Sequence, residues 1–164
     1  MPFTPLHFGP HALVGLSFEK RLDLPVFLGA NIAVDLEPLM VMSLGLPYPL
    51  HGIFHTFPVG GLAGLVFATL CFPFRGHLNR LMKYLRLPYA TSYTKMAVSG
   101  ILGAWLHILF DSVMYYDITP FYPFQANPLL GLLSPFAVRA VCAACFIPAL
   151  ILYVVLAFFR RTDK

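Results

Sequence analysis

The sequence predicts an all-α integral membrane protein with about five hydrophobic helical segments, the first of them short, plus a basic interfacial amphipathic helix. Of the 164 residues, 59% are hydrophobic and only 11% are charged, whereas about a quarter of the residues of a soluble domain are charged. The mean hydropathy is +0.76. So few charges could not cover the surface of a soluble globule, and a span needs about 20 residues. We therefore expect one membrane-embedded domain over residues 1–164.

The same numbers exclude other classes of protein. The apolar composition excludes a disordered chain and a collagen-like repeat, and the net charge of +4 gives no basic face for nucleic acid. The three cysteines all lie in apolar stretches, so we expect no disulfide framework. The start, MPFTPLHFGP, lacks the basic and apolar regions of a cleavable signal peptide. The lipid bilayer is therefore the expected partner.

The first two segments lie close together in the sequence. Residues 7–19 are apolar but too short to cross a membrane, and Lys20 and Arg21 close this segment. Asp23 is a suitable N-cap for the next helix, predicted over residues 24–45, which is long enough to cross.

The middle of the chain predicts one span and one surface helix. Residues 56–74 are apolar, and Gly60 and Gly64 have the spacing of small residues that favours close helix packing. Residues 75–95 carry five basic residues. Apolar residues recur there at the period of an interfacial amphipathic helix, at Leu78, Leu81, Met82 and Leu85.

Two further spans complete the chain. Residues 96–114 form an apolar helix that includes His107 and Asp111, and a loop rich in proline and aromatic residues follows it. Residues 135–159 form the longest apolar span, in which two cysteines are expected to be small buried residues.

The basic residues predict the orientation. Ten of the eleven lysines and arginines lie in residues 20–21, 75–95 and 160–164. Because these regions fall on one side of a five-segment chain, the positive-inside rule places them in the cytoplasm. The N-terminus and the loops at 46–54 and 115–134 are then expected outside the inner membrane. Arg139, near the outer end of the last helix, is the exception; it is either an interfacial anchor or an anion-binding group.

Histidines and acids recur at helical spacing. On a helix, residues four apart share one face with about 6 Å between them. Three pairs have this spacing: His7 and His11, His51 and His55, and His107 and Asp111. The last pair suits either a metal site or a buried hydrogen-bonded pair.

Three acids in apolar segments must be protonated, placed near the membrane interface, or neutralised. Asp35, Glu37 and Asp111 would each cost about 2.5–3.5 kcal/mol at the centre of a membrane helix, yet no lysine or arginine lies inside their spans. Histidine or a metal cation remains, and His with carboxylate is a ligand set for zinc and related ions. Pro38 can break the helix and turn both Asp35 and Glu37 towards one cavity. Alternatively, one of them is a ligand and the other supports a histidine.

The order of these motifs resembles a known family. The segments TPLHFG, AVDLEP, HGIFHT, LHILFDS and TPFYPF are similar, in sequence order, to motifs of the membrane-bound metal-dependent hydrolases, which include the LexA-regulated inner-membrane hydrolases. The chain departs from them at Val34, Glu37 and Leu106, where proline, aspartate and serine are usual. The resemblance implies a metal-dependent hydrolase with ligands at His7, Asp35, His51, His55, His107 and Asp111.

We therefore expect one or two divalent ions, zinc foremost and manganese or iron as alternatives, in the outer half of the membrane. The expected reaction is hydrolysis of a phosphoester or other lipid-linked substrate. Glu37, Asp35 and His107 are the candidate catalytic residues, and Glu37 is the candidate general base if it is not a metal ligand. Arg139 and Tyr122 are candidates for substrate binding. His11 and Asp117 are secondary candidates.

Two other functions fit the same residues. A metal or proton transporter would also place His and carboxylates in a membrane cavity, with ligands along a path to both faces. A structural metalloprotein would use a closed site of four ligands to fasten its helices.

Overall fold

The computed structural model describes residues 5–159, and these residues form helices and loops without a strand. Four helical stretches are long and apolar enough to cross a membrane: Leu24–Leu44, Phe57–Tyr84, Tyr93–Met114 and Pro135–Phe159. They match the predicted spans, so the all-α membrane fold class is confirmed. Three basic residues of the predicted C-terminal cluster, Arg160, Arg161 and Lys164, lie outside the described residues.

The remaining segment of the five predicted is the first in the sequence, and it is short. Helix α1 (Phe8–Ser17) has ten residues and follows a single 3-10 turn at Pro5–His7. At 1.5 Å per residue it is about 15 Å long, half of a bilayer core. Its first turn therefore lies at mid-depth in the bundle.

Side-chain hydrogen bonds cap the N-termini of three long helices. Asp23 caps α2 (Leu24–Leu44), because its carboxylate accepts a hydrogen bond from the Val26 N–H at 3.2 Å. This confirms the predicted N-cap. Thr56 caps α3 (Phe57–Cys71) and Ser92 caps α5 (Tyr93–Met114) in the same way.

Glycines bring α3 and α5 into backbone contact. A Cβ atom added at Gly64 would collide with the carbonyl oxygen of Gly100, and one added at Gly100 would collide with that of Gly64. Gly103 lies against the Phe27 carbonyl of α2 in the same manner. The close packing predicted from the glycine spacing is therefore confirmed, and it fixes α2 and α3 on α5.

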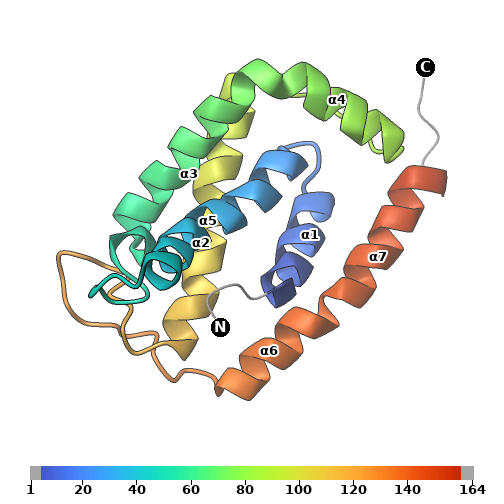
Figure 1. Ribbon diagram of the computed structural model, residues 1–164. Helices are drawn as coiled ribbons and strands as arrows, with labels where there is room; N and C mark the ends of the chain where they lie inside the picture. Colours follow the sequence, from blue (N-terminus) through green and yellow to red (C-terminus); the bar gives the residue numbers. More distant parts are fainter. Residues whose placement is uncertain (1–4, 160–164) are drawn as a thin grey trace.

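The basic amphipathic helix is shorter than predicted. A 3-10 turn (Phe72–Phe74) leads into α4 (Arg75–Tyr84), which lies across one end of the bundle (Figure 1). It ends where Arg86 adopts a left-handed φ of 57°, two residues before a proline. Of its apolar side, Met82 is buried and packs with Leu16 and Leu24, whereas Leu81 is exposed.

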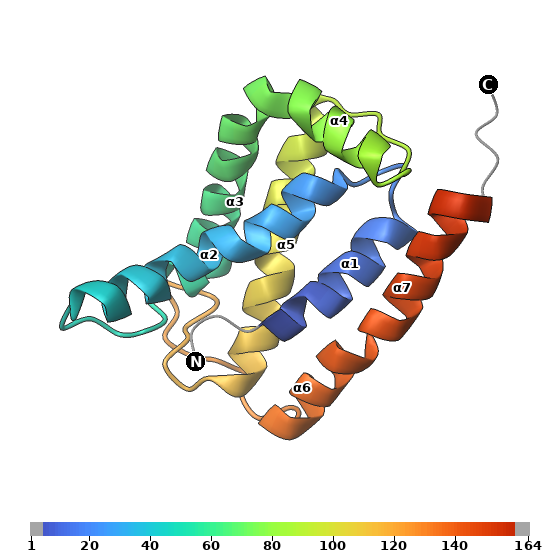
Figure 2. The same cartoon turned by 45° about the vertical axis from the view of Figure 1, so that its right-hand side comes forward.

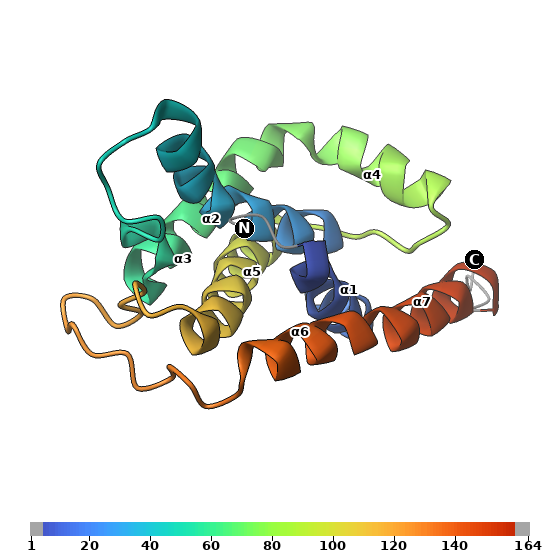
Figure 3. The same cartoon turned by 60° about the horizontal axis from the view of Figure 1, so that its bottom comes forward.

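The last two helices form an outer layer. Helices α6 (Pro135–Ala144) and α7 (Phe146–Val154) run end to end into a π-helical turn at Val155–Phe159. Helix α1 lies between this layer and the bundle of α2, α3 and α5 (Figures 2 and 3). Most side chains of α7 are exposed and apolar, as expected for a surface that faces lipid.

The two ends of the bundle differ. The turn between α1 and α2, helix α4 and the end of α7 lie at one end, which carries the described basic clusters (Figure 1). The loops at 45–56 and 115–134 meet at the other end, where the Phe57 N–H donates to the Pro120 carbonyl at 2.8 Å. We call these the basic end and the loop end.

Candidate metal centre

Four side chains from three elements meet inside the bundle. Asp35 comes from α2, His107 and Asp111 come from α5, and His55 comes from a 3-10 turn (Ile53–His55) just before α3. One ligand atom from each lies within 4.8 Å of the others, and together they could hold a metal ion. All four are buried, with exposed fractions of 0–4%.

The spacing of the ligand atoms suits a small divalent ion. The Nε2 atom of His107 lies 3.1 Å from Oδ2 of Asp111 and 3.3 Å from Oδ1 of Asp35. The Nε2 atom of His55 lies 3.8 Å from the same Oδ2 of Asp111. Ligands bound tetrahedrally at 2.0–2.2 Å are about 3.3–3.6 Å apart. Small side-chain adjustments would therefore bring this set to coordination distance.

The converging atoms have no hydrogen-bond partner among the described residues. These buried atoms are Oδ1 of Asp35, Nε2 of His55, Nε2 of His107 and Oδ1 of Asp111. An unsatisfied buried polar atom costs about 1–3 kcal/mol, so four of them in one place call for a shared partner. These four side chains could therefore hold a divalent cation, which would be that shared partner.

Hydrogen bonds on the far side of the rings orient both histidines. Asn31 lies 2.8 Å, through its Oδ1, from Nδ1 of His107. Glu37 lies 3.5 Å, through its Oε2, from Nδ1 of His55. Each acceptor favours the tautomer with the proton on Nδ1 and leaves the Nε2 lone pair towards the cluster. Such outer partners are typical of histidines that bind metals.

The charges of the cluster also favour a cation. Among the described residues, neither Asp35 nor Asp111 forms an ion pair with lysine or arginine. Burial lowers the pKa of His55, which lies outside the long spans, so its ring is neutral and can offer a lone pair. Two carboxylates and two imidazoles therefore present net negative charge to the cluster's centre.

His7 adjoins the same cluster from the start of α1. Its Nε2 lies 3.5 Å from Oδ1 of Asp111, and both atoms lack a hydrogen bond. Its ring meets the His107 ring edge-on, with centroids 5.0 Å apart. The mid-depth start of α1 thus brings His7 to the centre.

His11 is placed differently. It is fully buried, and its ring nitrogens lie 2.7 Å from the His7 carbonyl and 2.9 Å from the Gly103 carbonyl. These contacts tie α1 to α5. A neutral ring donates to only one of these carbonyls, but both nitrogens face the backbone and not the cluster.

His51 also lies outside the four-residue group. Its Nδ1 is 3.0 Å from both oxygens of Asp117, and its backbone N–H donates to Oδ2 of Asp117 at 3.2 Å. Its ring centroid is 4.7 Å from that of His55. The histidine pair predicted on one helical face is therefore found in a loop, with only His55 in the cluster.

The candidate substrate residues lie at the loop end or on the surface. Tyr122 is 46% exposed and lines a polar pocket together with His51 and Asp117. Arg139 is exposed on α6 and makes no hydrogen bond or ion pair with the described part of the chain.

The predicted break at Pro38 is not found. Helix α2 continues through Pro38 to Leu44. Asp35 and Glu37 therefore keep different directions: Asp35 faces α5, whereas Glu37 accepts hydrogen bonds from the N–H groups of Gly52 and Phe54 at 3.1 and 3.0 Å. The loop wraps around the Glu37 carboxylate, and no break is needed.

Asn31, which contacts His107 in the site, is not among the candidate residues predicted from the sequence. It is four residues before Asp35, so both lie on one face of α2. That spacing is the signal that could have identified it, since it repeats the pattern of the other pairs.

Comparison with protein-family models, with curated proteins and with solved structures found no match. The resemblance to the membrane-bound hydrolases therefore stays an expectation from the motifs.

Proposed function

We propose that this protein is an integral-membrane, metal-dependent hydrolase that acts on a phosphoester or other lipid-linked substrate at the outer face of the inner membrane. The observation that carries the proposal is the buried set of unpaired ligand atoms from Asp35, His55, His107 and Asp111. Zinc is the expected ion, because His and carboxylate ligands suit it; manganese and iron are alternatives.

The residues have distinct roles in this proposal. Asp35, His55, His107 and Asp111 would hold the ion, with His7 beside them. A divalent ion supplies Lewis-acid chemistry, which polarises a scissile bond and activates water as a nucleophile. Asp35 and His107 would therefore take part in catalysis as ligands of the ion.

The hydrogen bonds of Glu37 support a positioning role rather than that of a general base. Its Oε2 faces the Gly52 and Phe54 N–H groups and Nδ1 of His55. Because Nε2 of His55 faces the cluster, Glu37 lies behind the ring as seen from the ion's position. A base must reach the reacting proton directly or through one water.

The transporter alternative has less support. Along α2, buried Phe27 and Ala30 lie between Asp23 at the basic end and Asn31 beside the cluster. Buried Ala104 occupies the matching stretch of α5. His11 lies at this depth too, but both of its ring nitrogens face backbone carbonyls. These buried apolar residues interrupt a polar path from the cluster to the basic end.

A structural metal centre is the second candidate. The full burial of the four ligands favours it, since structural sites are closed. The polar pocket beside His55 favours the hydrolase, because it offers space for a substrate next to the cluster.

Hydrolysis assays separate these functions. Wild-type protein loaded with zinc or manganese should hydrolyse a phosphoester or another bond of a lipid-like substrate in liposomes, and Asp111→Ala should lose at least about 10²-fold in rate. Ser43→Ala, exposed on α2, is the control. Metal-loaded protein that hydrolyses no phosphoester, ester or amide would refute the hydrolase; if it also moves metal or protons across liposomes, it is a transporter.

A further inference from the structure

A polar pocket of about 240 Å³ lies at the loop end, between the two loops that meet there. Hydroxyl, amide and imidazole side chains and the Asp117 carboxylate line it, and none of the described residues in its lining is lysine or arginine. The lining side chains that can form hydrogen bonds include Tyr48, His51, Thr56, Thr119, Tyr122 and Gln125.

His51 is held rigidly in this pocket. It is 3% exposed, and Asp117 engages its Nδ1 and its backbone N–H. The Tyr115 ring packs at a centroid distance of 4.4 Å and the His55 ring at 4.7 Å. No hydrogen bond to a described residue engages Nε2, so this is the ring nitrogen left for a ligand.

The pocket adjoins the metal centre. Gly52 lines the pocket, and its N–H donates to Glu37, the partner of His55. The ring contact between His51 and His55 makes a second connection. A group bound in the pocket would therefore lie beside the cluster.

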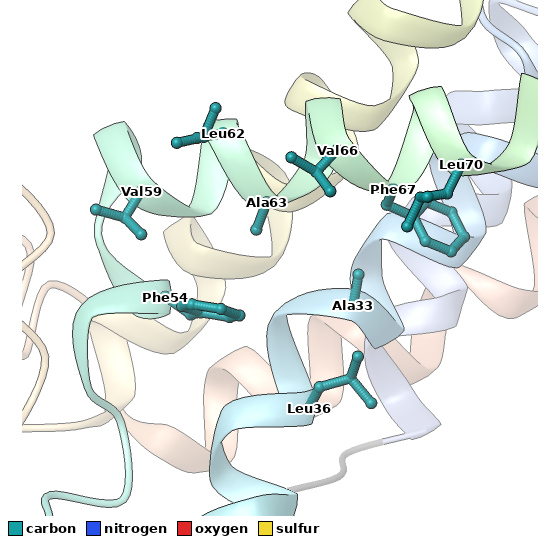
Figure 4. Close-up of a pocket in the computed structure, with 9 residues that line it drawn as sticks. All are labelled: Ala33, Leu36, Phe54, Val59, Leu62, Ala63, Val66, Phe67 and Leu70. Carbon is teal, nitrogen blue, oxygen red and sulfur yellow. The ribbon is translucent and has the colours of Figure 1, made fainter.

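An apolar groove approaches the same segment from the side that faces lipid. It has a volume of about 310 Å³ and runs between α2 and α3, with Phe54 at one end and Leu70 at the other (Figure 4). Ala63 points into it from α3 (Figure 4). Phe54 lies between two pocket-lining residues, Ile53 and Thr56. Groove and pocket thus meet at residues 52–56, which carry His55.

We infer that pocket and groove together bind one membrane lipid, with an uncharged, hydroxyl-bearing headgroup in the pocket and an acyl chain in the groove. This deepens the proposed function and rests on it for the reaction, because of the two substrate classes named there it selects a lipid-linked substrate with an uncharged headgroup rather than a phosphoester. The junction of headgroup and chain would lie at residues 52–56, next to the metal centre.

The chemistry of the lining selects this headgroup. A pocket without lysine or arginine is poorly suited to an anion, and the Asp117 carboxylate is already engaged by His51. Hydroxyl, amide and imidazole groups both donate to and accept from hydroxyls. The Tyr48 and Tyr122 rings add apolar faces with polar tips. Sugar and glycerol headgroups match this combination.

Lipid retention tests the inference without turnover. Native mass spectrometry of the full chain in detergent would compare a monoglucosyl diacylglycerol with phosphatidylcholine, in metal-stripped and metal-loaded protein. We expect the glycolipid to be retained at least about fivefold over phosphatidylcholine, since one or two ligand hydrogen bonds are worth that factor. His51→Gln and Asp117→Asn should abolish the preference, and Ala63→Phe should lower retention by filling the groove.

Two variants at exposed positions outside the pocket and the groove serve as matched controls. Tyr116→Phe in the exposed loop and Ala140→Phe on exposed α6 should retain the lipid like wild type, with circular dichroism as the folding check. Equal or better retention of phosphatidylcholine, or unchanged preference in folded His51→Gln and Asp117→Asn, would overturn the inference.

The outcomes separate this inference from the proposed function. A protein that retains the glycolipid through His51 but hydrolyses nothing contradicts the hydrolase alone. A metal-dependent hydrolase without His51-dependent retention contradicts the lipid site alone.

Discussion

At the scale of single residues, the direction of each imidazole decides its role. His55 and His107 each have an oxygen acceptor at Nδ1 and an unpaired Nε2 towards Asp111. His11 instead has both nitrogens at backbone carbonyls. The groups that face the ring nitrogens therefore decide whether a buried histidine belongs to the metal centre or to a contact between helices.

Removal of the outer acceptors tests this division. Asn31→Leu removes one acceptor, and Glu37→Gln replaces the other by a weaker, uncharged one. Each should weaken metal affinity about 10–100-fold without abolishing binding, because the ligands remain but their orientation is less fixed. Competition with a chelating dye measures the affinity. Asn79→Leu, exposed on α4, is the matched control. Wild-type affinity in both variants would show that these acceptors do not support the site.

His11 provides the opposite case. His11→Leu should lower thermal stability in detergent, because it removes a side-chain hydrogen bond to the backbone, worth about 0.5–1.5 kcal/mol, and metal content should stay at the wild-type level. Differential scanning fluorimetry and elemental analysis read the two effects. Loss of metal in a variant that remains folded would place His11 in the centre after all.

At the scale of helices, close backbone contact holds the ligands in register. The carbonyls of Gly64 and Gly100 lie where a Cβ atom would be, and this contact fixes α3, which begins just after His55, against α5 with His107 and Asp111. Packing of small residues, rather than burial from water, drives such association in a membrane.

A larger residue at this contact should separate the helices. Gly64→Leu should destabilise the protein by at least about 1–3 kcal/mol, the usual cost of overpacking, and should lower metal affinity as well. Gly76→Leu on α4 is the control, since a Cβ atom there meets nothing within 4 Å. Equal melting temperatures for the two variants would show that the α3–α5 contact has no such role.

Local patterns predicted most helices but only part of the site. The apolar runs, the Asp23 cap and the glycine spacing are local features, and each matches a structural element. The pairing of His107 with Asp111 also follows from spacing within one helix. The partner of His51 is 66 residues away, in another loop. Such a contact depends on how the loops meet, which no local pattern encodes.

Two errors have physical causes. Pro38 removes one backbone hydrogen bond but is tolerated within α2, as prolines often are in membrane helices. Residues 75–95 were predicted as one helix, but Arg86 turns the chain into a left-handed conformation and ends α4 early. In each case the tertiary setting outweighed a local preference.

At the scale of the whole molecule, charge divides the bundle into two ends. The basic turn after α1 and helix α4 lie at one end, and the loops beside the metal centre and the polar pocket lie at the other (Figure 1). The positive-inside rule predicts a cytoplasmic basic end, and hence an outward-facing pocket.

Cysteine labelling in intact cells tests this orientation. In a variant whose native cysteines are replaced, a cysteine at Lys83 on α4 should react only with reagents that cross the membrane. A cysteine at exposed Leu132 should react with impermeant reagents. Labelling of position 83 from outside would reverse the topology and place the centre at the cytoplasmic face.

The central claim is that Asp35, His55, His107 and Asp111 hold a divalent ion. Elemental analysis of protein purified from membranes without added metal tests it most directly. We expect at least one equivalent of a zinc-like ion per chain in the wild type, and loss of at least one equivalent in folded His107→Ala and Asp111→Ala, with Ser43→Ala unchanged. Metal-free wild-type protein that also takes up no zinc, manganese or iron on titration, or equal metal content in the folded wild type and both variants, would contradict the account.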